Sequence, residues 1–145
     1  IVHAYLADWL VTQGWNIASA SFLAPAATVE LFDSRIQPHL QSGKLGRYAQ
    51  FHLQDALERA DSTCRGILGY GRSLLYLVSQ ACEGGTPTPL IGMETAFEEI
   101  RQLYLDNVKA YTAQCADSAA STHGAFDDDD VTVKSVIRRI KAARG

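Results

Sequence analysis

The sequence predicts an α/β fold in which parallel strands are joined by crossover helices. Three short runs of strand-forming residues, 17–23, 47–53 and 108–115, are separated by segments with helical apolar spacing. Strands that alternate with helices in this way favour right-handed crossovers and a parallel sheet. With 145 residues, 47% of them hydrophobic, the chain is long enough for one core, so we expect one domain, or part of one, over 1–145.

The first third of the chain reads as helix, strand and helix. Residues 1–13 carry apolar side chains at helical spacing, and Gly14 suits a left-handed stop. The mostly apolar run 17–23 is typical of a buried parallel strand. Thr28 is placed to cap the next helix, and Pro38 begins a new turn. Because the chain opens inside a helical pattern and not with methionine, we expect that a preceding segment is missing.

The middle of the chain contains the second strand and two loops. Residues 47–53 alternate between apolar and polar side chains, which predicts a strand. Residues 54–71 are polar and then rich in glycine, as in a functional loop with a short helix. Ser73 offers a cap for an apolar helix over 74–82, and the Gly/Pro-rich segment 84–89 ends it in a surface loop.

The last third predicts a helix, the third strand and a closing helix. Residues 94–105 are amphipathic, 108–115 alternate, and 131–140 form a final amphipathic helix. The four aspartates 127–130 resemble a calcium ligand set only in composition, because the alternating spacing and the distal glutamate of a calcium loop are missing. We expect them to cap the final helix, and we expect Phe126 to anchor the loop against the core.

Charge and composition argue against several classes of partner. The net charge is −3 and the charges are interspersed, so we expect no nucleic-acid partner. The basic residues at the end of the final helix suit its dipole; they are Arg138, Arg139, Lys141 and Arg144. No apolar run is long enough to span a bilayer. Cysteines 64, 82 and 115 are far apart, which predicts buried or half-buried free thiols in a reducing, cytoplasmic compartment and neither a zinc site nor disulfides.

An acid and a histidine follow two of the predicted strands. Asp55 lies just past the second strand, and His123 lies in the loop after the third. Because the carboxyl ends of parallel strands meet at one edge of a sheet, the two side chains are expected at the same rim. A carboxylate that holds an imidazole in one tautomer is the arrangement needed to activate a serine hydroxyl. Asp61, farther along the same loop, is the alternative acid.

The other histidines have simpler interpretations. His52 lies in the middle of a predicted strand and is expected to be structural, whereas His3 and His39 are expected on helix surfaces. We predict no metal ligands and no cofactor.

The order of these motifs resembles the C-terminal half of an α/β hydrolase. The residues that carry the resemblance are 22–26 (Phe-Leu-Ala-Pro-Ala), 53–57 (Leu-Gln-Asp-Ala-Leu) and 121–126 (Ser-Thr-His-Gly-Ala-Phe), each after or at the end of a predicted strand. They are similar in particular to those of esterase-like serine hydrolases, and the resemblance covers nearly the whole chain. It implies half of a three-layer α/β-hydrolase-like sheet, whose missing N-terminal half would belong to the same domain.

The resemblance also implies an activity. The intact parent would hydrolyse an acyl ester of a small molecule through a Ser-His-Asp triad, with His123 as the base and Asp55, or alternatively Asp61, as the acid. Residues 1–13 look like the helix that follows the Gly-x-Ser-x-Gly nucleophile elbow. The nucleophilic serine and the oxyanion hole are not in this chain, so the isolated fragment is expected to be inactive. Segments 54–71 and 84–89 are where substrate contacts are expected.

Two other interpretations stay open at this stage. The chain could be a non-catalytic α/β binding or scaffold domain that uses the same rim for a partner. It could also be a helical interaction module, if the strand pattern is misread.

Overall fold

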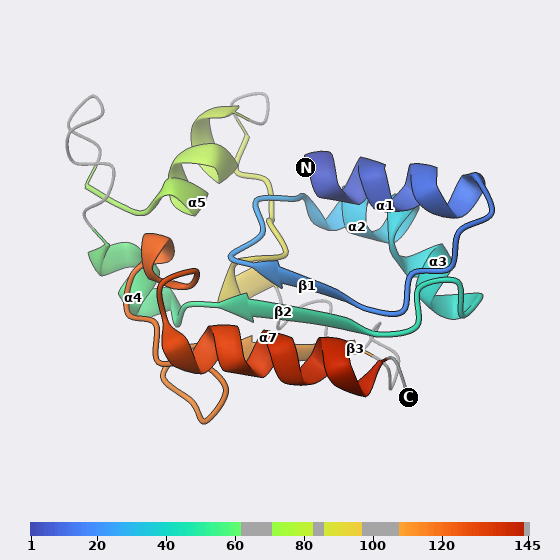
Figure 1. Cartoon of the computed structure of the whole chain (residues 1–145). Helices are drawn as coiled ribbons and strands as arrows, with labels where there is room; N and C mark the ends of the chain where they lie inside the picture. Colours follow the sequence, from blue (N-terminus) through green and yellow to red (C-terminus); the bar gives the residue numbers. More distant parts are fainter. Residues whose placement is uncertain (62–70, 83–85, 97–107, 144–145) are drawn as a thin grey trace.

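The structure, a computed structural model, describes residues 1–61, 71–82, 86–96 and 108–143. Three strands, β1 (Ala20–Leu23), β2 (Tyr48–His52) and β3 (Val108–Thr112), form a parallel sheet in the order β1-β2-β3. Figure 1 shows β2 at the centre, and all five of its residues are buried. The predicted α/β class and the three parallel strands are therefore confirmed.

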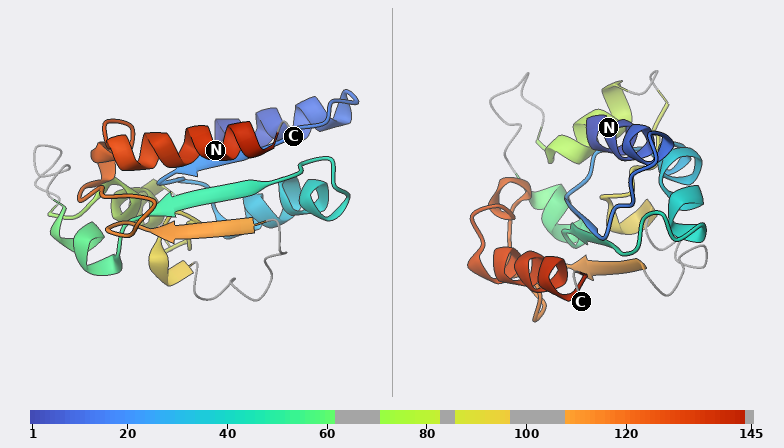
Figure 2. Two further views of the ribbon diagram at one scale, coloured as in Figure 1. Left: turned by 60° about the horizontal axis from the view of Figure 1, so that its bottom comes forward. Right: turned by 45° about the vertical axis from the view of Figure 1, so that its right-hand side comes forward.

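Helices cover both faces of the sheet. On one face, α1 (Val2–Thr12), α2 (Val29–Arg35) and α3 (Gln37–Gln41) pack around Tyr48, with Phe32 and Leu40 in the same buried cluster. On the other face, α7 (Asp130–Ala142) packs through Val136 against a cluster that contains Phe51 and Phe126. Figure 2 shows α7 and the N-terminal helices on opposite sides of the strands. The result is a three-layer α/β/α arrangement with β2 in the middle.

The remaining described elements gather around the carboxyl ends of the strands. Helix α4 (Asp55–Ala60) directly follows β2, and α5 (Leu74–Leu77) continues into a π-helical turn, Val78–Cys82. A 3-10 turn, His123–Ala125, lies between β3 and α7. The segment 54–71 was predicted to be a loop with a short helix, and α4 is a short helix at its start.

The strands are shorter than the sequence predicted, although their positions are correct. The first begins at Ala20 and not at residue 17, and only an isolated bridge between Ile17 and Leu45 extends it. The third ends at Thr112, after which Gln114 adopts a positive φ of 63° and the chain turns. Local turns therefore shorten the hydrogen-bonded ladder, while the side-chain alternation that predicted the strands runs on.

The predicted helix starts and stops are confirmed where the structure describes them. The side chains of Thr28 and Ser73 accept hydrogen bonds from the N–H groups of Leu31 and Tyr76, as N-caps do. Pro38 lies in the first turn of α3. Gly14 has φ of +90°, which a residue with a Cβ atom rarely adopts.

Several predictions fall outside the described residues. These are Cys64, most of the loop 54–71, part of the loop 84–89 and most of the helix predicted over 94–105. Of that last helix, residues 94–96 are described and are helical.

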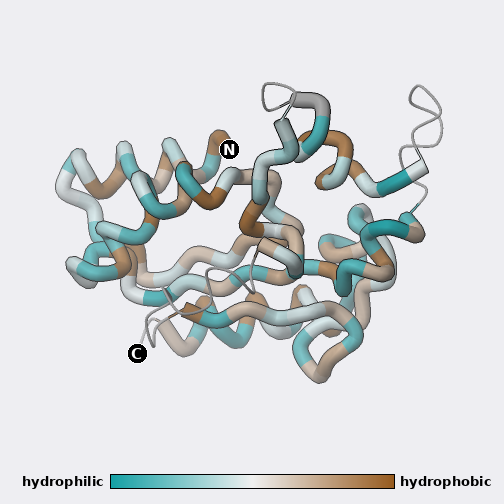
Figure 3. Tube along the Cα trace, turned by 180° about the vertical axis from the view of Figure 1, so that it is seen from behind, coloured by the Kyte–Doolittle hydropathy of each residue, from teal (hydrophilic) through white to brown (hydrophobic). Residues whose placement is uncertain are grey.

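Helix α1 is unusual because much of its apolar surface faces solvent. Figure 3 shows hydrophobic segments recurring along it. Val2 is 74% exposed and Trp9 56%, and the other large apolar side chains of this surface are Ile1, Tyr5 and Leu6. In the part of the chain that is described, no helix has the length and hydropathy needed to cross a bilayer.

Candidate active site

The carboxyl ends of β2 and β3 bring together the two segments from which the sequence predicted an acid and a base. Past β2, Leu53 forms an isolated parallel bridge with Met93 and α4 begins at Asp55. Past β3, the chain turns at Cys115–Ser118 and reaches His123. Helix α4 and the His123 turn therefore lie at one rim of the sheet, where ligands bind in open parallel sheets.

His123 is fixed at this rim through its backbone. Its N–H donates a hydrogen bond of 2.7 Å to Oδ2 of Asp61, a residue only 5% exposed. The His123 side chain is 15% exposed, so one edge of the ring can still meet solvent or a substrate. Phe126, which is 2% exposed, anchors the same segment in the core as predicted.

The carboxylate next to the His123 ring belongs to Glu58. Its Oε1 lies 3.7 Å from Nδ1 of His123, and its side chain is 1% exposed. That distance is within ion-pair range but too long for a hydrogen bond. Both oxygens of Glu58 and Nδ1 of His123 are buried without a hydrogen-bond partner among the described residues.

This arrangement is energetically costly on its own. An isolated carboxylate loses its hydration on burial, which costs several kcal/mol unless a partner compensates. Among the described residues, the His123 ring is the only titratable group recorded against the Glu58 carboxyl group. A closure of less than about 1 Å would turn the contact into a hydrogen bond. Glu58 and His123 thus form a buried acid-imidazole pair of the kind that concentrates at functional sites.

Asp55, the acid predicted for His123, is engaged elsewhere. Its Oδ1 accepts a hydrogen bond of 2.5 Å from the hydroxyl of Tyr76, and its Oδ2 accepts one of 2.7 Å from Nε of Arg59. Burial, and then this hydrogen bond, raise the pKa of Tyr76, so the phenol remains protonated and can donate. The hydrogen bond with Asp55 likewise raises the pKa of Arg59. The expected Asp55–His123 pair is therefore not among the described contacts.

Asp61, the alternative acid, does contact His123, although through the backbone. Its carboxylate accepts the main-chain N–H of His123 and so fixes the loop. The acid next to the imidazole ring is Glu58. The three acids of this segment therefore have different contacts: Asp55 binds Tyr76 and Arg59, Glu58 faces the imidazole, and Asp61 accepts the main-chain N–H of His123.

Sequence reasoning missed Glu58, although a signal was present. Residues 55, 58 and 61 follow one another at intervals of three, which places them near one face of a helix. Treating residues 54–71 as a loop hid that periodicity. Once α4 is known, its inward face brings a glutamate toward the histidine turn.

The other residues singled out in the sequence have structural roles. His52 is fully buried, with Nε2 3.0 Å from Oγ1 of Thr112, in line with its expected structural role. His39 is more buried than the surface position that was expected: its side chain is 15% exposed and its Nε2 lies 2.7 Å from Oδ1 of Asp8. That hydrogen bond, together with Arg35, lowers the pKa of Asp8.

The aspartate run 127–130 caps α7 as predicted. Asp129 is the N-cap residue and accepts hydrogen bonds from the N–H groups of Val131 and Thr132. Cys115, predicted to be at least half-buried, is an exposed free thiol because it lies in the turn after β3. Within the described ranges, no group of three or more acidic, histidine or cysteine side chains could hold a metal ion.

No hydroxyl or thiol of the described residues hydrogen-bonds to the His123 ring. Against known proteins, no family model matches the chain, and neither a curated protein nor a solved structure matches it.

Proposed function

We propose that this chain is part of an esterase-like serine hydrolase of the α/β-hydrolase type, in which His123 is the catalytic base. One observation carries the proposal: an imidazole at the carboxyl-end rim of a parallel sheet has its Nδ1 3.7 Å from a buried carboxylate that has no hydrogen-bond partner among the described residues. The order of the strand, the acid segment, the strand and the histidine supports the same assignment.

The proposed chemistry uses the ring as a relay for one proton. A serine hydroxyl of the intact parent attacks the carbonyl carbon of an acyl ester, and Nε2 of His123 takes the hydroxyl proton. The imidazolium then gives this proton to the leaving alcohol, which leaves an acyl-serine. A water molecule, deprotonated by the same nitrogen, hydrolyses the acyl-serine and restores the serine. The nucleophile and the oxyanion hole belong to the part of the parent outside this chain.

We assign the orienting carboxylate to Glu58 in preference to Asp55 and Asp61. The role requires an acceptor at Nδ1 that keeps the proton there and stabilises the imidazolium. Glu58 is the acid whose carboxylate faces that atom, at 3.7 Å. Asp55 is occupied by Tyr76 and Arg59, and Asp61 by the main-chain N–H of His123.

The test is ester hydrolysis by the intact parent. We expect turnover of p-nitrophenyl acetate and covalent labelling of a serine by a fluorophosphonate, and we expect His123→Ala to reduce both by at least about a thousandfold. His3→Ala, which alters an exposed histidine on α1, is the matched control and should leave both unchanged. The isolated chain should show neither activity. Full turnover by the His123→Ala protein would refute the assignment.

A binding or scaffold domain is the second candidate function. The exposed apolar surface of α1, with Val2 at 74% and Trp9 at 56% exposure, favours it because large exposed apolar patches mark interaction sites. A folded parent that neither reacts with a fluorophosphonate nor hydrolyses simple esters would support this alternative.

A further inference from the structure

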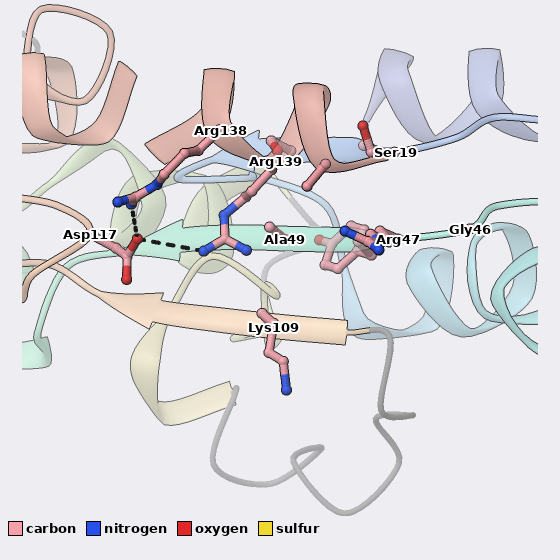
Figure 4. Close-up of a pocket in the computed structure, with 12 residues that line it drawn as sticks. Ser19, Gly46, Arg47, Ala49, Lys109, Asp117, Arg138 and Arg139 are labelled. Carbon is pink, nitrogen blue, oxygen red and sulfur yellow. Dashed lines mark hydrogen bonds and ion pairs between the residues drawn. The ribbon is translucent and has the colours of Figure 1, made fainter. Parts of the chain in front are cut away.

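A second concave site lies at the opposite end of the strands from His123. It is a cavity of about 680 Å³ on the α7 face of the sheet. We call it the basic trough, and its polar side chains include Ser19, Ser21, Arg47, Lys109, Arg138 and Arg139. Figure 4 shows Arg138 and Arg139 descending from α7, with Arg47 at the other end of the trough and Lys109 on β3.

Positive charge dominates the basic trough. Of its described lining residues, four are arginine or lysine, and Asp117 alone carries a carboxylate. Asp117 is already occupied, because its Oδ1 accepts hydrogen bonds of 2.7 Å from Arg138 and from Ser135 and lies 3.6 Å from Arg139. Among the described residues of the trough, the remaining cations thus have no further carboxylate to neutralise them.

Unused hydrogen-bond donors remain around the cavity. Arg47 and Lys109 are exposed, and neither forms an ion pair with any residue that the structure describes. The guanidinium of Arg139 stacks on Tyr111 at 4.1 Å, and its Nε is buried without a hydrogen-bond partner among the described residues. The Arg139 side chain is therefore held in place while part of its donor capacity is unused.

The helix dipole explains only part of this concentration of charge. Arg138 and Arg139 lie near the C-terminal end of α7, where cations are favoured. Arg47 lies just before β2 and Lys109 lies on β3, where no such effect applies. Four cationic residues from three separate segments line one cavity, and this concentration of positive charge suits an anion.

We propose that the basic trough binds a small molecule that carries a phosphate group. Arginine forks and lysine ammonium groups match the several oxygens and the multiple charge of phosphate better than the two oxygens of a single carboxylate. Ser19 and Ser21, which also line the cavity, add neutral hydroxyl donors. A volume of about 680 Å³ is in the range of small-molecule sites. This inference does not depend on the hydrolase assignment.

Pyrophosphate is the probe for this proposal, and calorimetry at low and at moderate salt is the measurement. We expect saturable binding to the chain that weakens as salt rises. Arg47→Gln and Lys109→Gln should each weaken it by about tenfold, because each removes a charged donor from the cavity. Lys134→Gln is the matched control: it removes one exposed lysine charge from α7, where Lys134 pairs with Asp130 outside the trough.

Three results would overturn the proposal. The first is the absence of saturable pyrophosphate binding at low salt. The second is an equal loss in the Lys134→Gln control, which would show only nonspecific attraction. The third is tighter binding of a hexaglutamate peptide than of pyrophosphate, which would assign the trough to an acidic protein segment. Because all three substituted side chains are exposed, we expect each variant to keep the circular dichroism spectrum of the unmodified chain.

Discussion

The two ends of the sheet carry charge in opposite ways. At the carboxyl-end rim, Glu58 and Asp61 are buried, and the charges lie within the protein against His123. At the amino end, Arg47 and Lys109 face solvent with no ion-pair partner among the described residues. Buried charges can tune the reactivity of a neighbour, whereas exposed charges attract ligands with little cost to the fold. This contrast is consistent with the catalytic role that we propose for the rim and the binding role that we propose for the trough.

The largest expected effect is on catalysis at the rim. In the intact parent, Glu58→Gln should lower kcat/KM for p-nitrophenyl acetate by about 10³- to 10⁴-fold, because an amide cannot hold the Nδ1 proton or stabilise the imidazolium as a carboxylate does. Steady-state kinetics across pH 5 to about 9 would measure the loss, and the pH profile would separate a positioning defect from misfolding.

Asp55→Asn is the matched control for Glu58→Gln. It alters a carboxylate on the same helix, three residues away, that contacts Tyr76 and Arg59. We expect it to change kcat/KM by less than about tenfold, since the contacts recorded for Asp55 are with Tyr76 and Arg59 and not with the imidazole ring. A large loss with Asp55→Asn and a small one with Glu58→Gln would return the acid role to Asp55.

The next largest effect is on stability, and substitutions of two acids at the rim, Glu58 and Asp61, should change it in opposite directions. Glu58→Met should raise the free energy of unfolding of the chain by about 1 kcal/mol or more, because it replaces a carboxylate without a hydrogen-bond partner among the described residues with an apolar side chain of similar size. Asp61→Ala should lower it by about 1 to 3 kcal/mol, because the partly buried N–H of His123 loses its acceptor. Urea unfolding at pH 7 measures both. Destabilisation by Glu58→Met would mean that Glu58 supports the fold.

A smaller effect on stability is expected at the N-terminus of α7, where Asp129 caps the helix. Asp129 caps this helix and also accepts the N–H of Ala119, in the loop that leads to His123. Although burial opposes it, hydrogen bonds from Thr132 and from the main chain lower the pKa of Asp129. A lowered folded pKa means that the charged cap stabilises the fold above the unfolded pKa, about 3.9, and that this contribution disappears as pH falls through the folded value.

Asp129→Ala should therefore cost about 1 kcal/mol at pH 7 and less at a pH below 3. Urea unfolding at the two pH values provides the comparison. Asp128→Ala, which changes an exposed neighbour, should alter stability by less than about 0.5 kcal/mol at both. A cost for Asp129→Ala that does not depend on pH would show that the cap acts without its charge.

The fold was largely predictable from the sequence because its signals are local. Side-chain alternation located β2 and β3, and the caps at Thr28, Ser73 and Asp129 are each read from a few neighbouring residues. The strand ends were less accurate, since a turn such as the one at Gln114 interrupts hydrogen bonding without interrupting the pattern. Local sequence patterns thus locate helices and strands well but predict their ends poorly.

The sites were harder to predict because they depend on contacts between distant segments. Sequence order placed His123 at the rim and offered Asp55, or alternatively Asp61, as its acid. It missed Glu58, whose contact with the imidazole depends on how α4 faces the histidine turn. The trough was not anticipated at all. Arg47, Lys109 and Arg139 are more than about 25 residues apart and meet only through the parallel register of the sheet and the packing of α7.

The smallest expected effect tests whether the trough is free of structural charge pairs. Lys109→Gln should leave the free energy of unfolding within about 0.5 kcal/mol, because its ammonium group is exposed and has no ion-pair partner among the described residues. Any change should be a slight increase in the free energy of unfolding, because removing one cation relieves its repulsion from neighbouring cations. This increase should shrink as salt is added. Urea unfolding at low and moderate salt would detect it. A loss above about 1 kcal/mol would mean that Lys109 supports the fold, and the contrast between buried acids at the rim and exposed cations at the amino end would no longer hold.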